Sequence, residues 1–188
     1  MIEVTGVMDG GDILAAASTA IGPAETAGEL HDRLAELGAS LVAEALDQMV
    51  AGTVVRVAQD PARATRARKL SREMAWVDFG RPAAAVSARI RGMSPWPGVQ
   101  VELVDAGGRP RVQATIVKCQ ATGSEAAHGA EEWGRVLGDR SVACGAGSVE
   151  ILLIQPAGKK VMELGAFANG YGFGAGARVR SVVGSPTG

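Results

Sequence analysis

Two adjacent lysines, Lys159 and Lys160, are the residues whose type and placement most clearly suggest chemistry. They follow an apolar run at residues 150–154 that is typical of a buried strand. Pro156 cannot donate to a strand ladder and Gly158 permits a tight turn, so the strand should end where the lysines begin. A rigid strand that carries paired cations to the surface suits a polyanion such as a phosphate backbone. The alternative is an ordinary solvated turn, which two lysines alone would favour.

The charges are divided unevenly along the 188 residues, although the net charge is only −1. Residues 1–60 hold 2 Lys and Arg against 10 Asp and Glu, a balance of −8. Residues 61–188 hold 17 against 10, a balance of +7. This asymmetry predicts two units, of which the second meets an anionic partner. The alternative is that the basic surface serves solubility alone.

Composition narrows the classes of protein to which the chain can belong. Apolar residues make up 47% and charged residues 21%, which is typical of a globular chain. No apolar run is long enough to span a membrane, and the first residues lack the pattern of a signal peptide. Cys119 and Cys144 form no C-x-x-C pair, so we expect neither a four-thiolate zinc site nor a disulfide framework. We therefore expect a cytoplasmic protein that binds no metal and no membrane.

The acidic part predicts one long amphipathic helix over about residues 27–51, which Gly52 is suited to end. Its apolar positions recur at helical spacing and include Leu30, Leu34, Leu37 and Leu41. Residues 2–7, 13–20 and 53–57 are expected to form short strands, at the edge of a sheet whose other strands are absent. Because the leucines need a surface to cover, a homodimer through residues 1–60 is one expectation.

The basic part opens with a linker and a short helix. Residues 61–70 carry arginines without an apolar period and are expected to be a basic linker. A helix is predicted over residues 82–92, with Val86 and Ile90 four residues apart on its inner face. The prolines on both sides of Trp96 fix the backbone there and predict that its indole is pinned in the core.

The pattern then changes to the period of two that is typical of strands. Residues 99–103 and 112–117 predict a hairpin with a turn at 105–108, and residues 120–131 predict a polar loop. Further short strands are expected at 134–137, 141–143, 149–154 and 178–183, with a short helix at 163–169. Several short strands after one helix predict a small barrel.

Seven short stretches of the chain carry a recognisable pattern: GP at 22–23, TAGELHDRLAELG at 26–38, KLSRE at 69–73, VDFGRPA at 77–83, IR at 90–91, PWPG at 95–98 and QPAGKK at 155–160. In their order, and over nearly the whole chain, they resemble the C-terminal part of methionyl-tRNA formyltransferases. The resemblance implies the end of a Rossmann-like formyltransferase domain at residues 1–60, a linker at 61–70 and an OB-like C-terminal domain that binds tRNA at 71–188. The implied fold class is thus an α/β remnant followed by a small OB-like β-barrel. The implied reaction is formyl transfer from 10-formyltetrahydrofolate to the amino group of methionyl initiator tRNA.

The resemblance places one catalytic residue of the family, Asp9, in this chain. In the family an asparagine, a histidine two positions later and a distant aspartate carry the reaction, and Asp9 matches the aspartate. The only asparagine here, Asn169, is followed two positions later by Tyr171, so the Asn-x-His pair is missing. Without it to stabilise the oxyanion, we expect the chain alone to be poorly active or inactive and to bind the folate poorly. Read from the residues alone, Asp9 is a turn-former beside two glycines.

Two positions depart from the family's pattern. Its aspartate–tryptophan pair is Asp78-Phe79 here, and its usual capping serine or threonine is Gly80. Both changes are expected to weaken that corner of the domain slightly.

The resemblance directs the RNA prediction to a group of cations. The predicted RNA contacts are Arg66, Arg68, Lys69, Arg89, Arg91, Lys159 and Lys160. Two alternatives remain for the function. The chain could be a stand-alone RNA-binding module that lost catalysis, or a diverged enzyme that reuses the scaffold with a new site.

Overall fold

The computed structural model describes residues 1–184, except for the side chains of residues 124 and 125, and the chain divides into two compact units. Unit 1 comprises Met1–Gly22 and Glu29–Lys69. Unit 2 comprises Pro23–Gly28 and the chain from Leu70 onward. The predicted domain boundaries at residues 60 and 70 stay a prediction.

Unit 1 contains most of the predicted long helix. Helix α1 runs over Ala27–Val50, which confirms the helix expected over about residues 27–51. The chain leaves helical geometry at Gly52, whose φ of 68° lies in the left-handed region that glycine adopts without strain. The Gly52 N–H donates to the Met49 carbonyl oxygen over 3.2 Å. A single turn of 3₁₀-helix, η1 at Pro61–Arg63, interrupts the basic linker.

The short strands expected in the acidic part do not form. Over residues 1–60, pairing is limited to single bridges that join Ile13 to Ile2 and to Val57. Such pairing adds little stability when no further strand lies beside it, because an isolated hairpin is only marginally stable in water. The expectation of strands over residues 1–60 is therefore wrong. The origin of this part of the chain in an α/β domain stays a prediction.

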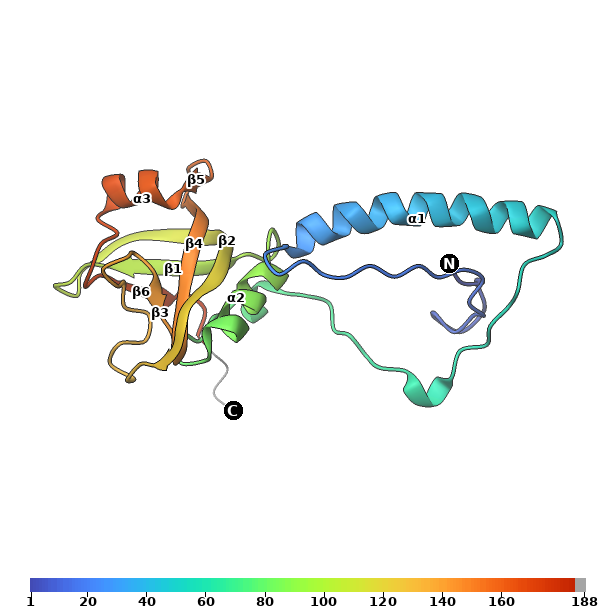
Figure 1. The fold of residues 1–188 in the computed structure, drawn as a ribbon, viewed down its shortest axis with the longest axis horizontal. Coiled ribbons are helices and arrows are strands. Elements are labelled where there is room, and N and C mark those ends of the chain that lie inside the picture. Colours follow the sequence, from blue (N-terminus) through green and yellow to red (C-terminus); the bar gives the residue numbers. More distant parts are fainter. Residues whose placement is uncertain (185–188) are drawn as a thin grey trace. The chain divides into compact units, whose positions relative to one another are not determined.

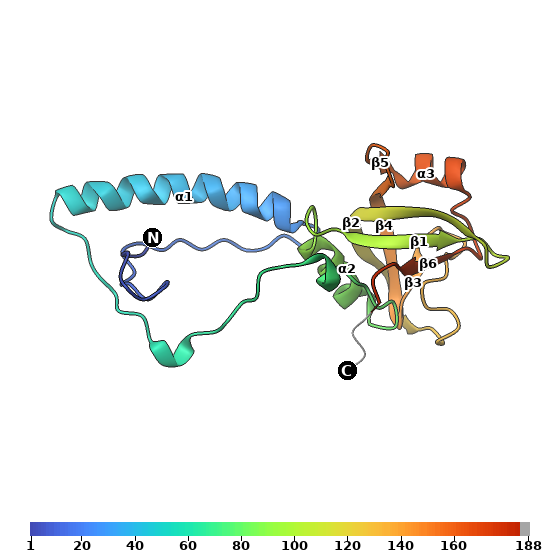
Figure 2. The ribbon, with the colours of Figure 1, turned by 180° about the vertical axis from the view of Figure 1, so that it is seen from behind.

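Unit 2 is built on one antiparallel sheet (Figures 1 and 2). Its strands are β1 (Val99–Val104), β2 (Pro110–Ala127), β3 (Val142–Ala143), β4 (Ala146–Pro156), β5 (Met162–Glu163) and β6 (Arg178–Ser181). The order across the sheet is β3-β4-β2-β1-β6, and β5 pairs with β4. The predicted hairpin is confirmed as β1 and β2, which pair in antiparallel register from Val99 with Ile116 onward.

Residues 134–137, expected to be a strand, connect the two edges of this sheet. On one side the N–H of Gly134 donates to the Ala143 carbonyl oxygen in β3 over 2.9 Å. On the other side the N–H of Val179 in β6 donates to the Gly134 carbonyl oxygen over 2.7 Å. Because one segment bonds both β3 and β6, the sheet curls into a small barrel-like domain, as the run of short strands predicted.

Strand β2 extends through most of the polar loop expected at residues 120–131. Gln120 pairs with Glu150 in β4, and its side-chain Nε2 donates to the Glu150 Oε2 over 2.7 Å. The pairing reaches Ala127, which lies opposite Ala146. The polar composition of residues 120–127 predicted a loop. Strand β4 nevertheless supplies hydrogen-bond partners for their backbone, so these polar residues form part of β2.

Two helices pack on different sides of the curled sheet, as both views show (Figures 1 and 2). Helix α2 spans Ala83–Gly92 and follows η2, a 3₁₀ turn at Arg72–Met74. Val86 and Ile90 of α2 are buried in the core, as their spacing predicted. Helix α3 spans Leu164–Tyr171 and buries Phe167, whose ring stacks on Tyr171 with centroids 4.8 Å apart.

Trp96 corrects one expectation about the core. Its side chain is 52% exposed, so the indole is not pinned inside the domain. The loop is anchored by its neighbours instead, because Ser94 is buried and its Oγ donates to the Val117 carbonyl oxygen over 2.7 Å. The Gly98 N–H also donates to the Met93 carbonyl oxygen over 2.8 Å. With these anchors the tryptophan side chain is left on the surface.

The corner that departs from the family's pattern is closely packed. A Cβ built on Gly80 would lie 2.8 Å from the Cε3 atom of Trp133, so the glycine leaves room for the indole. The Asp78 carboxylate accepts the Gly80 N–H over 2.9 Å and fixes the turn. The Gly145 N–H donates to the carbonyl oxygens of Phe79 and Arg81 over 2.9 and 3.0 Å. Gly80 thus leaves a space that Trp133 occupies.

Candidate nucleic-acid interface

Lys159 and Lys160 lie in an exposed turn between β4 and β5. Strand β4 ends at Pro156, and Gly158 adopts a left-handed φ of 70°, as the sequence indicated. The Lys159 N–H donates to the Pro156 carbonyl oxygen over 3.0 Å, and Gln155 Nε2 donates to the Lys159 carbonyl oxygen over 2.9 Å. The turn is therefore fixed by its backbone, while both ammonium groups extend into solvent.

Arg89 binds to the protein itself. Its Nε donates to the Trp76 carbonyl oxygen and its Nη2 to the Met74 carbonyl oxygen, both over 2.7 Å. The guanidinium carbon also lies 3.8 Å from the centroid of the Trp76 ring, a cation–π geometry. Partial burial lowers the pKa of Arg89, which remains charged because its ordinary pKa is far above neutrality. The side chain therefore fastens the segment before α2 to the helix.

Arg91 is a second arginine of α2 with partners inside unit 2. Its Nη1 donates to the Ser87 Oγ over 2.6 Å, one helical turn earlier. Its Nε donates to the Glu25 carbonyl oxygen over 3.2 Å. This bond ties the Pro23–Gly28 segment to α2 and helps explain why that segment belongs to unit 2. Both arginines thus have structural roles, and their RNA contacts stay a prediction.

The three predicted cations of the linker lie in unit 1, whereas the other four lie in unit 2. Arg66, Arg68 and Lys69 are all exposed in a chain segment without regular structure. Within unit 2, the arginines are on α2 and the lysines are at the β4–β5 turn. Of the seven predicted residues, only the two lysines are both exposed and part of unit 2.

Asp9 lies in an exposed turn of unit 1. Its φ of 53° is left-handed, and the turn is closed by Gly10, whose N–H donates to the Val7 carbonyl oxygen over 3.2 Å. The side chain of Gln59 donates to the Asp9 and Gly11 carbonyl oxygens, each over 2.7 Å. These contacts fit the turn-forming role that the residues alone indicated, and the catalytic role of Asp9 stays a prediction.

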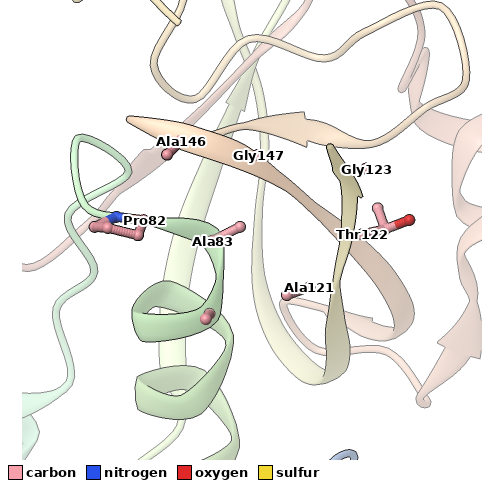
Figure 3. A pocket seen from close by; sticks show the side chains of 8 residues that line it. Pro82, Ala83, Ala121, Thr122, Gly123, Ala146 and Gly147 are labelled. Atoms are coloured by element: carbon pink, nitrogen blue, oxygen red, sulfur yellow. The ribbon is translucent and has the colours of Figure 1, made fainter. Parts of the chain in front are cut away.

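A pocket of about 390 Å³ opens where the start of α2 meets β2 and β4 (Figure 3). Small residues line it, namely Pro82, Ala83, Ala84, Ala121, Thr122, Gly123, Ala146 and Gly147. Among these residues only Thr122 has a polar side-chain atom, and none is ionisable. The lining therefore offers no general base and no thiol or amine nucleophile for chemistry of its own.

A second pocket, of about 300 Å³, has the opposite character because arginines line it. Arg135, Arg178 and Arg180 contribute to it, together with Asp105. None of these arginines was among the predicted RNA contacts. Arg135 is distant in sequence from Arg178 and Arg180, so the sequence did not indicate that the three lie together. The available signal was the spacing of Arg178 and Arg180, which places two cations on one face of a strand.

Among the other residues with reactive side chains, the two cysteines are buried and His31 lies on the surface of α1. Burial raises the pKa of the Cys119 thiol to about 11 and that of Cys144 to about 12, so neither is a thiolate at neutral pH. His31 is exposed on α1, and its Nδ1 lies 3.3 Å from the Asp32 carboxylate. In the described part of the chain, no three His, Cys, Asp or Glu side chains are grouped to hold a metal ion. None of the described helices combines the length and apolar character that crossing a membrane requires.

Comparison with known proteins identifies one family. Residues 69–172 match the family described as formyl transferase, C-terminal domain. Three similar proteins are methionyl-tRNA formyltransferases. That of Heliobacterium modesticaldum is 42% identical over 91% of this chain and 55% of its own length. The corresponding values are 40%, 87% and 50% for Sinorhizobium medicae, and 38%, 90% and 54% for Chlamydia muridarum. The chain thus spans about half the length of these relatives, and it belongs to the formyl transferase C-terminal domain family.

Proposed function

We propose that this chain supplies the tRNA-binding part of a methionyl-tRNA formyltransferase activity in the cytoplasm. The observation that carries the proposal is the family match over residues 69–172, which covers most of the barrel-like unit. The three relatives reported above, which match 87–91% of the chain, are named methionyl-tRNA formyltransferase. The exposed lysine turn supports an RNA partner, because a fixed backbone holds two cations in solvent.

Phosphate contacts would position the RNA without reading its sequence. Lys159 and Lys160 would each neutralise a phosphate as point charges. Arg66, Arg68 and Lys69 would add cations from an exposed segment without regular secondary structure. The exposed indole of Trp96 offers a face on which an unpaired base can stack. Arg89 and Arg91 would contribute mainly by holding α2 in place.

The formyl-transfer step would depend on groups outside this chain. The sequence has no asparagine followed two positions later by histidine, and Asp9 lies in an exposed turn. One oxyanion donor is worth roughly 3–4 kcal/mol of transition-state stabilisation, so a chain without the pair should react very slowly. The pocket at the start of α2 has no ionisable lining residue, which argues against a diverged enzyme with its site there.

Binding to initiator tRNA tests the RNA part of the proposal. We expect Lys159→Glu with Lys160→Glu to weaken binding and to reduce its dependence on salt concentration, because phosphate neutralisation releases counterions. The matched control is Arg72→Glu with Arg81→Glu, which reverses two exposed charges of unit 2 elsewhere. Equal effects of both pairs would remove the lysine turn from the interface. No binding by the unchanged chain would refute an RNA-binding function.

Formylation of methionyl initiator tRNA by the purified chain, with 10-formyltetrahydrofolate as donor, tests the catalytic part. We expect turnover far below that of a full-length relative such as the Heliobacterium modesticaldum enzyme, assayed in parallel. Comparable turnover would show that these residues form a complete active site and would refute the division of labour proposed here.

A further inference from the structure

The arginine-lined pocket of unit 2 is built from three separate segments. Arg178 and Arg180 are on β6, Arg135 is on the segment that closes the sheet, and Asp105 begins the β1–β2 turn. Gly108 and Gly176 also line the pocket, so backbone rather than side chains forms part of its wall. The pocket is open to solvent and has a volume of about 300 Å³, which is ample for a phosphate group.

The strand pairing places these like charges side by side. Arg135 and Arg178 form an antiparallel bridge, so they are directly opposite one another. Arg180 follows two residues after Arg178, and the intervening Val179 is buried, so the two arginines share the outer face of β6. Like charges directly opposite one another destabilise a sheet. The three arginines on this face therefore repel one another unless a bound anion neutralises their charge.

One of the three arginines is held rigidly. The Nη1 of Arg178 donates to the Trp133 carbonyl oxygen over 2.7 Å, and its Nη2 donates to the Glu131 carbonyl oxygen. A guanidinium has five N–H donors, so Arg178 retains donors for a ligand in a fixed orientation. The side chains of Arg135 and Arg180 are exposed and make no ion pair in the described structure.

The nearby carboxylates do not cancel the positive charge. Asp105 accepts the backbone N–H groups of Gly107 and Arg109 over 2.9 and 3.0 Å, and these bonds hold its pKa below the ordinary value. The lowered pKa keeps Asp105 ionised at neutral pH, so it offsets one of the three arginine charges and the pocket lining stays positive. Glu102 lies opposite Arg180 in the β1–β6 pairing, yet the two residues form no ion pair in the described structure.

We propose that the pocket formed by Arg135, Arg178 and Arg180 is a phosphate-binding site. Arginine suits this role because its planar fork of donors matches two phosphate oxygens at once. If the proposed function holds, on which this step rests, the occupant is a backbone phosphate of the bound RNA, at a place distinct from the lysine turn. A free phosphate compound would have the same chemistry.

The test compares two double variants of the full chain. Arg135→Ala with Arg180→Ala removes two pocket cations but keeps Arg178, whose bonds hold the neighbouring loop. Arg72→Ala with Arg81→Ala removes two exposed cations of unit 2 outside the pocket. Each is measured by thermal unfolding with and without pyrophosphate at low salt, and by initiator-tRNA binding over a salt series.

We expect pyrophosphate to raise the unfolding temperature of the unchanged chain and of the control, but not of the pocket variant. The pocket variant should also bind tRNA about tenfold or more weakly, with a salt slope lower by about 1. Without ligand it should unfold no earlier than the unchanged chain, since the repulsion is relieved.

The outcomes separate the possible occupants. Loss of pyrophosphate stabilisation with tRNA binding equal to the control would assign the site to a free phosphate compound. Equal behaviour of both double variants in both measurements would overturn the site. Failure of the unchanged chain to bind tRNA would overturn the proposed function, and the pyrophosphate measurement would still decide whether the pocket binds phosphate.

Discussion

At the scale of single residues, Gly145 shows how a position without a side chain determines local packing. A Cβ built there would lie 2.0 Å from the Gly80 carbonyl oxygen and 2.8 Å from its carbonyl carbon. Its N–H bonds to two carbonyl oxygens of residues 79 and 81, so the backbone cannot move away without losing them. The close approach joins the start of β4 to the turn before α2.

We expect Gly145→Ala to reduce the free energy of unfolding by about 2–3 kcal/mol, because the added methyl group meets backbone rather than a movable side chain. The control is Gly138→Ala, where nothing lies within 4 Å of the new Cβ, and its effect should stay within about 0.5 kcal/mol. Denaturation in urea measures both changes. Equal stability of the two variants would show that the corner is not closely packed.

At the scale of elements, Arg89 connects α2 to the segment that precedes it. Its two hydrogen bonds reach carbonyl oxygens of residues 74 and 76, and its guanidinium stacks on Trp76. A lysine would keep the charge but lose the planar fork that makes both bonds and the stacking. Replacing Arg89 by lysine therefore distinguishes a structural role of its guanidinium from direct RNA binding.

We expect Arg89→Lys to lower the free energy of unfolding by about 1.5–3 kcal/mol, the range for hydrogen bonds from a charged group. Affinity for tRNA, measured where the variant is fully folded, should change little. The control Arg72→Lys, at an exposed position of η2, should leave both quantities unchanged. A stable Arg89→Lys variant with weakened tRNA binding would instead place the guanidinium on the RNA.

The elements that could be predicted are those whose signals are local. Helix α1, helix α2 and the β1–β2 hairpin follow from apolar periods and from glycine or proline at their ends. The errors arise where a distant partner decides the structure. Residues 120–127 are a strand because β4 pairs with them, and residues 1–60 lack the neighbouring strands that would extend their bridges.

The same reason limits what could be predicted of the site. The exposure of the lysine turn follows from Pro156 and Gly158, which are adjacent to it. The acceptor for Arg91 is a carbonyl oxygen 66 residues away, and Arg135 meets Arg178 only because the sheet closes. Tertiary partners, and not residue types, distinguish a structural arginine from one that faces a pocket.

At the scale of the whole molecule, the two units differ in how they bury apolar side chains. The buried residues that form the core cluster all lie between Val77 and Val179, in unit 2. In unit 1, one face of α1 leaves large apolar side chains exposed, namely Leu34, Val42, Leu46 and Met49. Their spacing is helical, so they form one stripe, which is the kind of surface that binds another apolar surface.

This stripe predicts that the full chain associates with itself, as expected for a homodimer through residues 1–60. Two acidic parts, each with a balance of −8, would repel one another, so we expect association to strengthen as salt screens the charges. The binding of tRNA should weaken under the same change, since it releases counterions. Opposite salt dependences would therefore distinguish the two surfaces.

Sedimentation velocity over a range of salt and protein concentrations measures the association. Leu34→Gln with Leu46→Gln should abolish it, whereas Val161→Gln with Val182→Gln, at exposed aliphatic positions of unit 2, should not. A chain that stays monomeric throughout would show that the stripe is not an interface between copies.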